Sequence, residues 1–476
     1  MSLPHHFVEA SGFIRLGFLQ TRPTRQQPLS RWSIGGETLD RDYTSYDAFK
    51  TYLDDLGAKR IRLQGGWARC ERVKGHYDFA WLDAIVDDAL ARGVQPWLEL
   101  SYGNPIYEGG GAAALAGGIP HSTQALAAWD AWVQSMVMHF DGRVNEWEIW
   151  NEPDLGEAHA TPKFTAREFA LFHCRTVDTV LAVQPEARII GLALAHLPLD
   201  RPAHLGGAAF VDTVLDVWAA NGHAEKLYAV TYHQYCHVPE KHYPAFEAFR
   251  TQVRACAPHV QFWQGEAGAP STPADRAVGA LSDIDWDEWT QAKWVLRRMA
   301  GDMAHGVDLT NIFQMADMYY ATDDHFSGLN PKGLLEANPD CTIKGPKQSY
   351  HAYRFMASLF GGGVRCQARP EASGGKAGLE AHLLKGNGEQ DIRFVYWQGG
   401  ALPETGEGGC MESVDFILTG VNLRDPVLVD PLHGTVWSVP EGRVIPESGG
   451  QIRLEGFPVL DRPLVLAERN SIHFEP

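Results

Sequence analysis

The sequence predicts an α/β protein in which a (β/α)8 barrel is followed by a β-sandwich. Short apolar runs alternate with helix-like stretches from the N-terminus to residue 360, and after that point short strands separated by turn residues take over. The 476 residues also exceed the size at which one hydrophobic core usually stops growing. We therefore expect a barrel domain in residues 1–360 and a sandwich domain in residues 361–476, with the first dozen residues packed on the sandwich.

Eight apolar runs are the expected barrel strands. They are Phe13–Phe18, Lys59–Gln64, Gln95–Ser101, Val144–Asn151, Arg188–Ala193, Tyr228–Tyr235, Gln261–Glu266 and Leu309–Met315. Amphipathic stretches between them, which we expect to be helices, include Trp81–Arg92, Thr123–His139, Ala166–Val183 and Trp286–His305. A doubly wound sheet is the alternative, but no Gly-rich phosphate loop follows the first strand.

The C-terminal part is expected to hold short antiparallel strands. They are Leu379–Leu384, Ile392–Trp397, Ser413–Leu418, Val427–Val429, Ile452–Leu454 and Leu464–Ala467. Turn residues such as Gly408-Gly409 and Gly449-Gly450 separate them, which is typical of a small sandwich.

Composition and charge exclude several classes of partner. The net charge of −18 disfavours phosphate backbones and anionic membranes, so we expect no nucleic acid and no membrane partner. Met1–Gln20 has no basic segment followed by a long apolar run, which predicts a cytoplasmic protein without a signal peptide. The seven Cys form no CxxC pair, which predicts free thiols rather than a zinc site.

The aromatic content is consistent with a carbohydrate ligand. The chain has 15 Trp, 15 Tyr and 21 Phe, and the flat C–H faces of sugar rings pack well on aromatic rings. A large core also uses aromatic residues, so composition alone leaves both explanations open.

Two glutamates end expected strands of the barrel. Glu152 follows the fourth strand and Glu266 ends the seventh. The C-terminal ends of barrel strands meet at one face, where active sites of this fold lie. Hydrolysis of a glycosidic bond needs two carboxyl groups on opposite sides of that bond, so this pair is suited to that chemistry.

The flanking residues resemble a known group of enzymes. Trp150-Asn151-Glu152-Pro153 resembles the acid/base motif of clan A glycoside hydrolases, whose acid/base ends strand four and whose nucleophile ends strand seven. The segments Gly75–Phe79 and Gly93–Leu100 resemble the second helix and third strand of glycoside hydrolase family 39, which includes β-xylosidases and α-iduronidases.

This resemblance implies a retaining exo-glycosidase, β-xylosidase-like, that works by double displacement. Glu152 is then the acid/base and Glu266 the nucleophile, and no metal or cofactor is expected because the two carboxyls supply both functions. The expected partner is an oligosaccharide or glycoside, and the chain is expected to be a monomer or a small homo-oligomer.

Four further residues match positions of the resembling families. Asn151 is expected to bond the sugar 2-hydroxyl, and Tyr235 to orient the nucleophile. His233 is expected to hold Glu152 or a sugar hydroxyl. Arg62 either lies beside the nucleophile or bridges the barrel's own carboxylates, such as Glu148 or Glu99.

The residues expected to contact the sugar depart from the family pattern. Gln64 stands where the xylosidases have His, Phe313 stands where they have Trp, and Tyr320-Ala321 replaces an acidic pair. Gln64, Asn104, Phe313 and Asp317 are the candidate sugar contacts, and His159, Asp154 and Gln314 are further candidates. The identity of the substrate sugar therefore remains open: the alternatives to xylose are the sugars of a β-glucosidase, an arabinosidase or an iduronidase. A non-catalytic sugar-binding barrel and a transglycosylase are the remaining alternatives.

Overall fold

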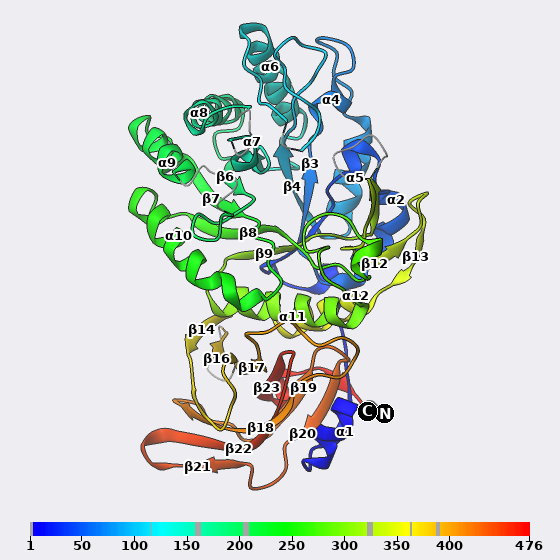
Figure 1. The fold of residues 1–476 in the computed structure, drawn as a ribbon, viewed down its shortest axis with the longest axis vertical. Coiled ribbons are helices and arrows are strands. Elements are labelled where there is room, and N and C mark those ends of the chain that lie inside the picture. Colours follow the sequence, from blue (N-terminus) through cyan, green and yellow to red (C-terminus); the bar gives the residue numbers. More distant parts are fainter. Residues whose placement is uncertain are drawn as a thin grey trace.

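The computed structural model describes residues 3–115, 117–157, 163–202, 209–320, 327–361, 364–386 and 391–476. It confirms the predicted fold class, because a closed eight-stranded barrel lies beside a region of antiparallel sheets. In Figure 1 the barrel fills the upper part of the molecule and the antiparallel sheets the lower part, where both chain ends lie close together.

The barrel strands follow one another in chain order. They are β2 (Trp32–Gly35), β3 (Arg60–Gln64), β4 (Gln95–Leu100), β5 (Glu146–Ile149), β6 (Arg188–Leu194), β7 (Leu227–Tyr232), β8 (Gln261–Ala267) and β9 (Leu309–Ile312). Neighbouring strands pair in parallel, and β2 pairs with β9 to close the barrel. β5 and β8 are the fourth and seventh strands of the barrel, as predicted.

The first predicted barrel strand, Phe13–Phe18, is wrong. β1 (Ile14–Leu19) joins the sandwich, where it pairs antiparallel with β20 (Thr435–Ser438) and β24 (Phe474–Glu475). β1 exposes Ile14 and Phe18, whereas all four residues of β2 are buried. A strand of a parallel barrel is covered on both faces, and the short run Trp32–Gly35 meets that condition.

Helices surround the barrel. The longer ones are α5 (Ala80–Ala91), α6 (Thr123–His139), α8 (Ala166–Val183), α9 (Phe210–Ala220), α10 (Tyr243–Cys256), α11 (Glu288–Ala304) and α12 (Gln348–Leu359). Short ones are α2 (Tyr46–Phe49), α3 (Leu53–Leu56), α4 (Trp67–Cys70) and α7 (Pro153–Glu157). Side-chain caps set the starts of three of them: Ser122 caps α6, Thr165 and Glu168 form a capping box on α8, and Asp287 caps α11.

Two antiparallel sheets form the sandwich. The larger has the order β14 (Arg365–Ala368), β16 (Leu379–Lys385), β17 (Ile392–Gln398), β23 (Leu464–Glu468), β19 (Pro426–Asp430), β20, β1 and β24. The smaller has the order β15 (Glu371–Ser373), β18 (Met411–Thr419), β22 (Gln451–Leu460) and β21 (Val444–Pro446). Val8 of α1 (Leu3–Ala10) and Phe13 lie in the core of the sandwich, where the Phe13 ring meets Phe457 with centroids 5.5 Å apart.

Helix α11 joins the barrel to the sandwich and lies between them in Figure 1. Nearly all of its residues are buried. Its Lys293 pairs with Asp461 at 2.9 Å, and its Arg297 donates to the carbonyl of Ala401 at 2.8 Å. These charged contacts fix the sandwich on the side of the barrel.

Two hairpins follow β9. They are β10 (Met318–Tyr320) with β11 (Gly328–Asn330), and β12 (Leu335–Ala337) with β13 (Ile343–Pro346). Among the described residues, no helix combines the length and apolar character that a membrane crossing requires.

Candidate active site

Glu152 stands just beyond β5, where the chain turns sharply into α7. Trp150 and Glu152 adopt positive φ values of 70° and 48°, which side-chain-bearing residues rarely do. The backbone N–H of Glu152 donates to the carbonyl of Ala193 at 2.9 Å, which holds this turn against β6. Backbone strain of this kind costs about 1–3 kcal/mol per residue and persists where the surroundings impose it, typically at functional sites.

Glu266 lies within β8 and is held by two donors. The hydroxyl of Tyr235 donates to its Oε1 at 2.7 Å, and Nη1 of Arg62 donates to its Oε2 at 2.8 Å. Each carboxylate oxygen thus receives one hydrogen bond, which fixes the orientation of the group.

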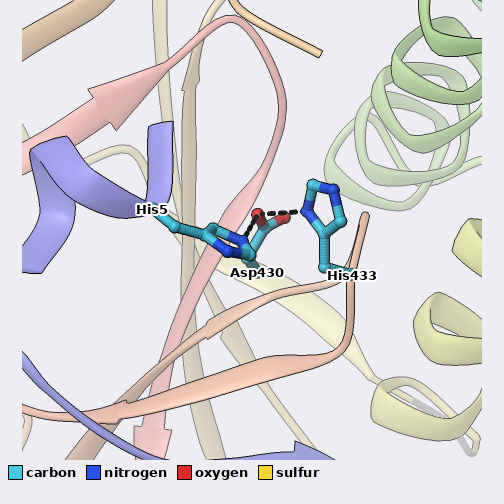
Figure 2. A group of neighbouring side chains, drawn as sticks. All are labelled: His5, Asp430 and His433. Atoms are coloured by element: carbon cyan, nitrogen blue, oxygen red, sulfur yellow. Dashed lines mark hydrogen bonds and ion pairs between the residues drawn. The ribbon is translucent and has the colours of Figure 1, made fainter. Parts of the chain in front are cut away.

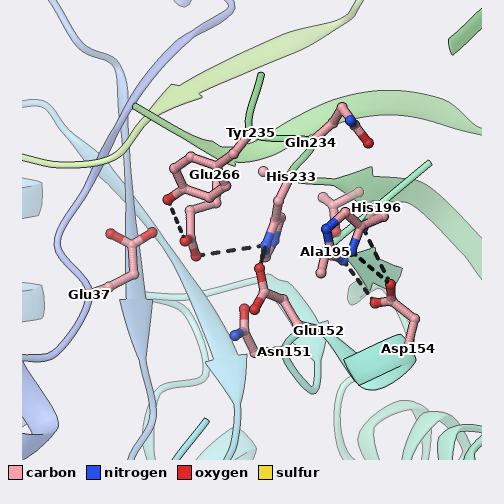
Figure 3. Close-up of polar contacts among 12 residues, drawn as sticks. Glu37, Asn151, Glu152, Asp154, Ala195, His196, His233, Gln234, Tyr235 and Glu266 are labelled. Atoms are coloured by element: carbon pink, nitrogen blue, oxygen red, sulfur yellow. Dashed lines mark hydrogen bonds and ion pairs between the residues drawn. The ribbon is translucent and has the colours of Figure 1, made fainter. Parts of the chain in front are cut away.

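His233 lies between the two glutamates, as Figure 3 shows. Its Nδ1 is 2.9 Å from Oε1 of Glu152 and 3.8 Å from Oε2 of Glu266. One carboxylate oxygen from each glutamate and a ring nitrogen of His233 all lie within 4.8 Å of one another. The two carboxyl groups therefore face the same small space.

Burial shifts the pKa values of Glu152 and His233. Burial, and then the carboxylate of Asp154, raise the pKa of Glu152 to about 7. Burial also lowers the pKa of His233 to about 4, so the imidazole is neutral at pH 7. A carboxyl group with a pKa near the working pH is suited to give and take a proton.

Arg62 has both of the contacts that the sequence left open. It lies beside Glu266 and also bridges the barrel's own carboxylates, with Nη2 2.6 Å from Glu99 and Nε 2.8 Å from Glu148. Its Nη2 also donates to Oδ1 of Asn151 at 2.9 Å, and its Nη1 lies 3.3 Å from Oε1 of Glu37. The side chain is fully buried.

Burial favours the protonated form of two of the carboxyl groups around Arg62. Burial raises the pKa of Glu37 and of Glu99 to about 8, against the opposing effect of the Arg62 charge. Four ionised carboxylates around one guanidinium would repel one another strongly, and protonation of two of them limits that repulsion.

Two pockets adjoin the pair of glutamates. The inner pocket has a volume of about 60 Å³ and includes Glu37, Gln64, Tyr102 and Asn151 in its wall. The outer pocket has a volume of about 400 Å³ and is lined, among others, by Tyr235, His196, Asn330 and Lys332. Glu152, Glu266, Phe313, Leu115 and Tyr320 line both, so the pockets meet at the glutamates.

The predicted residues that converge here are Glu152, Glu266, Asn151, Arg62, His233, Tyr235, Gln64 and Phe313. Gln64 lines the inner pocket. Its side-chain carbonyl accepts a hydrogen bond from Arg41 at 2.8 Å, and its side-chain amide donates to the Tyr102 hydroxyl at 3.3 Å. Asn151 donates to that same hydroxyl at 2.9 Å.

Three candidates have their side chains engaged elsewhere. Asn104 donates to the backbone carbonyl of Glu71 at 2.8 Å and accepts from the N–H of Ile106, which stabilises its loop. Asp317 pairs with Lys347 at 2.6 Å and accepts from the N–H of Gly333.

Asp154 accepts from the N–H of Ala195 at 2.8 Å and pairs with Arg201 at 2.6 Å. Gln314 is buried, and neither it nor the other three lines either pocket. His159 lies outside the described residues.

Sequence reasoning missed Glu37, Arg41, Tyr102 and Lys332, which all line the pockets. Glu37 lies two residues beyond the end of β2. A search for a short apolar strand followed by Gly-Glu could have found it. Lys332 follows the β11 strand, and no sequence signal marks it.

One family model matches part of the chain. Residues 41–214 match the model of glycosyl hydrolases family 39, a segment that includes Asn151 and Glu152. Over this segment the chain is similar to the family 39 enzymes, which supports an O-glycosyl hydrolase.

Solved structures of low sequence identity share the fold. A family 39 glycoside hydrolase from Bacteroides cellulosilyticus WH2 has 19% identity and a TM-score of 0.65, with 94% of this chain and 82% of that chain covered. A monomeric β-xylosidase from Caulobacter crescentus CB15 has 17% identity and a TM-score of 0.56, with 96% and 100% covered. A glucosidase from Croceicoccus marinus has 12% identity and a TM-score of 0.57, with 95% and 99% covered.

Proposed function

We propose that the chain is a retaining exo-glycoside hydrolase, β-xylosidase-like, with Glu152 as acid/base and Glu266 as nucleophile. The separation of the two carboxyl groups carries the proposal, because an oxygen of each lies within 4.8 Å of the other. Retaining enzymes hold these groups about 5–5.5 Å apart, whereas inverting enzymes leave about 6.5–9.5 Å for a water molecule.

The contacts of each glutamate support a division of roles. Glu152, whose pKa burial raises to about 7, carries a proton at and below neutral pH and gives it to the leaving oxygen. Glu266, with hydrogen bonds from Tyr235 and Arg62, attacks the anomeric carbon and forms a glycosyl ester.

The second half of the reaction reverses the proton transfer. Glu152, now ionised, takes a proton from a water molecule, and the resulting hydroxide displaces the Glu266 carboxylate from the sugar. His233 touches Glu152 throughout and is neutral, so it orients the carboxyl group without compensating its charge.

The inner pocket is the expected site of the terminal sugar. Asn151 lies in its wall, oriented by Arg62 and Tyr102, and its amide is placed to bond a sugar hydroxyl.

Azide rescue tests the nucleophile. Replacing Glu266 by Gly should lower hydrolysis of a nitrophenyl β-xyloside by at least about 10³-fold, and added azide should restore turnover and yield the glycosyl azide of inverted configuration. Glu186→Gly is the matched control, because Glu186 is exposed in the turn before β6 and should keep full activity. A Glu266→Gly variant with undiminished hydrolysis would refute the assignment.

A second candidate function is hydrolysis of a uronic acid glycoside, which Lys332 favours. Its ammonium donates to Oδ1 of Asn330 at 3.1 Å, and among the described residues no carboxylate lies within ion-pair distance of it. Burial lowers its pKa to about 7, a cost that a carboxylate in the outer pocket would offset.

A panel of nitrophenyl glycosides separates the two candidates. The panel covers xylose, glucose, galactose, arabinose and iduronic acid types, each assayed with the wild type and with Lys332→Met. A uronidase should lose at least about tenfold in kcat/KM on the uronide in the variant and little on the neutral glycosides, since only the uronide needs the cation. A xylosidase should favour the xyloside in both proteins.

A further inference from the structure

A side chain of the N-terminal helix meets two side chains of the β19–β20 hairpin on the sandwich, as Figure 2 shows. His5 comes from α1, Asp430 ends β19, and His433 lies in the turn between β19 and β20. The cluster is separate from the glutamate pair, which lies at the barrel mouth, and the proposed function does not use it.

The polar atoms of this cluster converge on one point. Oδ2 of Asp430 is 3.6 Å from Nε2 of His5 and 3.2 Å from Nδ1 of His433. All three atoms lie within 4.8 Å of one another. A tetrahedral zinc ion with bonds of about 2.0–2.2 Å places neighbouring ligand atoms roughly 3.3–3.5 Å apart, close to the distances seen here.

We propose that His5, Asp430 and His433 form a binding site for a divalent transition-metal cation of the zinc type. The ligand atoms are Nε2 of His5, Oδ2 of Asp430 and Nδ1 of His433, and water completes the tetrahedron. Two imidazoles with one carboxylate suit zinc and its neighbours in the transition series rather than calcium or magnesium, which prefer oxygen ligands throughout.

The surroundings hold the carboxylate ligand in place. Asp430 is fully buried, and Nη2 of Arg462 donates to its Oδ2 at 2.9 Å. The N–H of Leu432 donates to its Oδ1, also at 2.9 Å. Ligating carboxylates are usually hydrogen-bonded in this way by a second layer of residues.

The two imidazoles are also fixed by their neighbours. Oε1 of Glu407 lies 3.0 Å from Nε2 of His433, on the side of the ring away from Asp430. The ring of Trp289 lies 5.6 Å from that of His433, and Trp437 lies 5.3 Å from His5. Side-chain exposures of 13% for His5 and 18% for His433 leave a path by which a cation can enter.

The position of the site indicates what the metal does. His5 belongs to the N-terminal helix, Asp430 and His433 to the β19–β20 hairpin, and Trp289 to α11 beneath the barrel. A bound cation would fasten α1 to the sandwich at the place where the sandwich meets the barrel. Because the cation binds the folded chain, it raises the free energy of unfolding in proportion to the logarithm of its concentration.

Zinc titration of the whole chain tests the proposal. Protein stripped with a chelator and then desalted should bind one Zn²⁺ per chain at this site in calorimetry, and its thermal unfolding midpoint should rise with added Zn²⁺. His5→Ala and His433→Ala should each weaken Zn²⁺ binding by more than the roughly 10–100-fold that loss of a second-shell partner costs. Bound Co²⁺ should give the intense visible absorption of a tetrahedral site in the wild type and lose it in both variants.

Two control variants separate this site from other histidines and carboxylates. His6 is exposed on the same helix, so His6→Ala should bind Zn²⁺ like the wild type. Glu152, His233 and Glu266 form the other such group among the described residues, so a Glu152→Gln/Glu266→Gln variant should keep the sandwich site.

Two outcomes would overturn the proposal. One is that the wild type binds no Zn²⁺, which would mean that Nδ1 of His433 simply donates a proton to Asp430. The other is that binding survives in His5→Ala and His433→Ala but is lost in the double glutamine variant, which would place the metal at the barrel mouth.

Discussion

The hydroxyl of Tyr235 donates a 2.7 Å hydrogen bond to Oε1 of Glu266, from a residue three positions beyond the end of β7. Burial, and then the Glu266 charge, raise the pKa of Tyr235, so the phenol keeps its proton and acts only as a donor. The bond joins two adjacent strand ends of the barrel and orients the proposed nucleophile.

Replacing Tyr235 by Phe should therefore lower kcat more than it changes KM. A hydrogen bond to a charged group contributes about 1.5–3 kcal/mol, which corresponds to a loss of roughly 10–100-fold in kcat. Steady-state kinetics on a nitrophenyl glycoside measure the effect. The control is Tyr232→Phe, because the Tyr232 hydroxyl is buried with no hydrogen-bond partner in the described structure and lines neither pocket. Equal losses in the two variants would show that the effect is one of packing.

Activity should decline on the alkaline side of the pH profile, and the midpoint of this decline should lie near the pKa of Glu152. Burial and then Asp154 raise that pKa to about 7, so the group is protonated below pH 7 and loses its proton above it. Activity that needs the protonated acid should fall about tenfold per pH unit above that point. In Glu152→Gln this alkaline limb should be absent from the residual activity on a dinitrophenyl glycoside, whose leaving group needs no acid. An unchanged alkaline limb in that variant would assign it to another group.

Asp317 should prove structural rather than a contact to the sugar. Asp317→Asn breaks its buried pair with Lys347, which costs about 3–5 kcal/mol of the free energy of unfolding. KM should change little, since Asp317 lines neither pocket. Denaturant unfolding and steady-state kinetics on the same preparations measure both. The exposed Asp340 provides the control, and Asp340→Asn should unfold at nearly the same denaturant concentration as the wild type. If Asp317→Asn raises KM without lowering the free energy of unfolding, Asp317 contacts the sugar after all.

Much of the barrel could be predicted because its strands are buried on both faces. Strand β6 reads as an almost continuous apolar run, and α6 and α8 agree with their predicted bounds residue for residue. The positions of Glu152 and Glu266 followed from strand ends, which the sequence marks well. Arg62, His233 and Tyr235 were found through the family resemblance.

The rest of the site depends on contacts that no local pattern contains. Phe13–Phe18 looked like a first strand because it is a short apolar run, yet it pairs with β20 more than 400 residues away. That error hid β2 and with it Glu37. Asp317 was taken for a sugar contact because Lys347, its partner, lies 30 residues further along the chain.

The stereochemistry of the first product tests the central claim most directly. Proton NMR spectra recorded in the first minutes of hydrolysis of a β-glycoside, before the free sugar equilibrates, show which anomer the enzyme releases. Double displacement through Glu266 predicts the β-anomer first, with the α-anomer appearing only at the rate of spontaneous mutarotation. Release of the α-anomer first would mean a single displacement by water, and the assignment of Glu266 as nucleophile would be wrong.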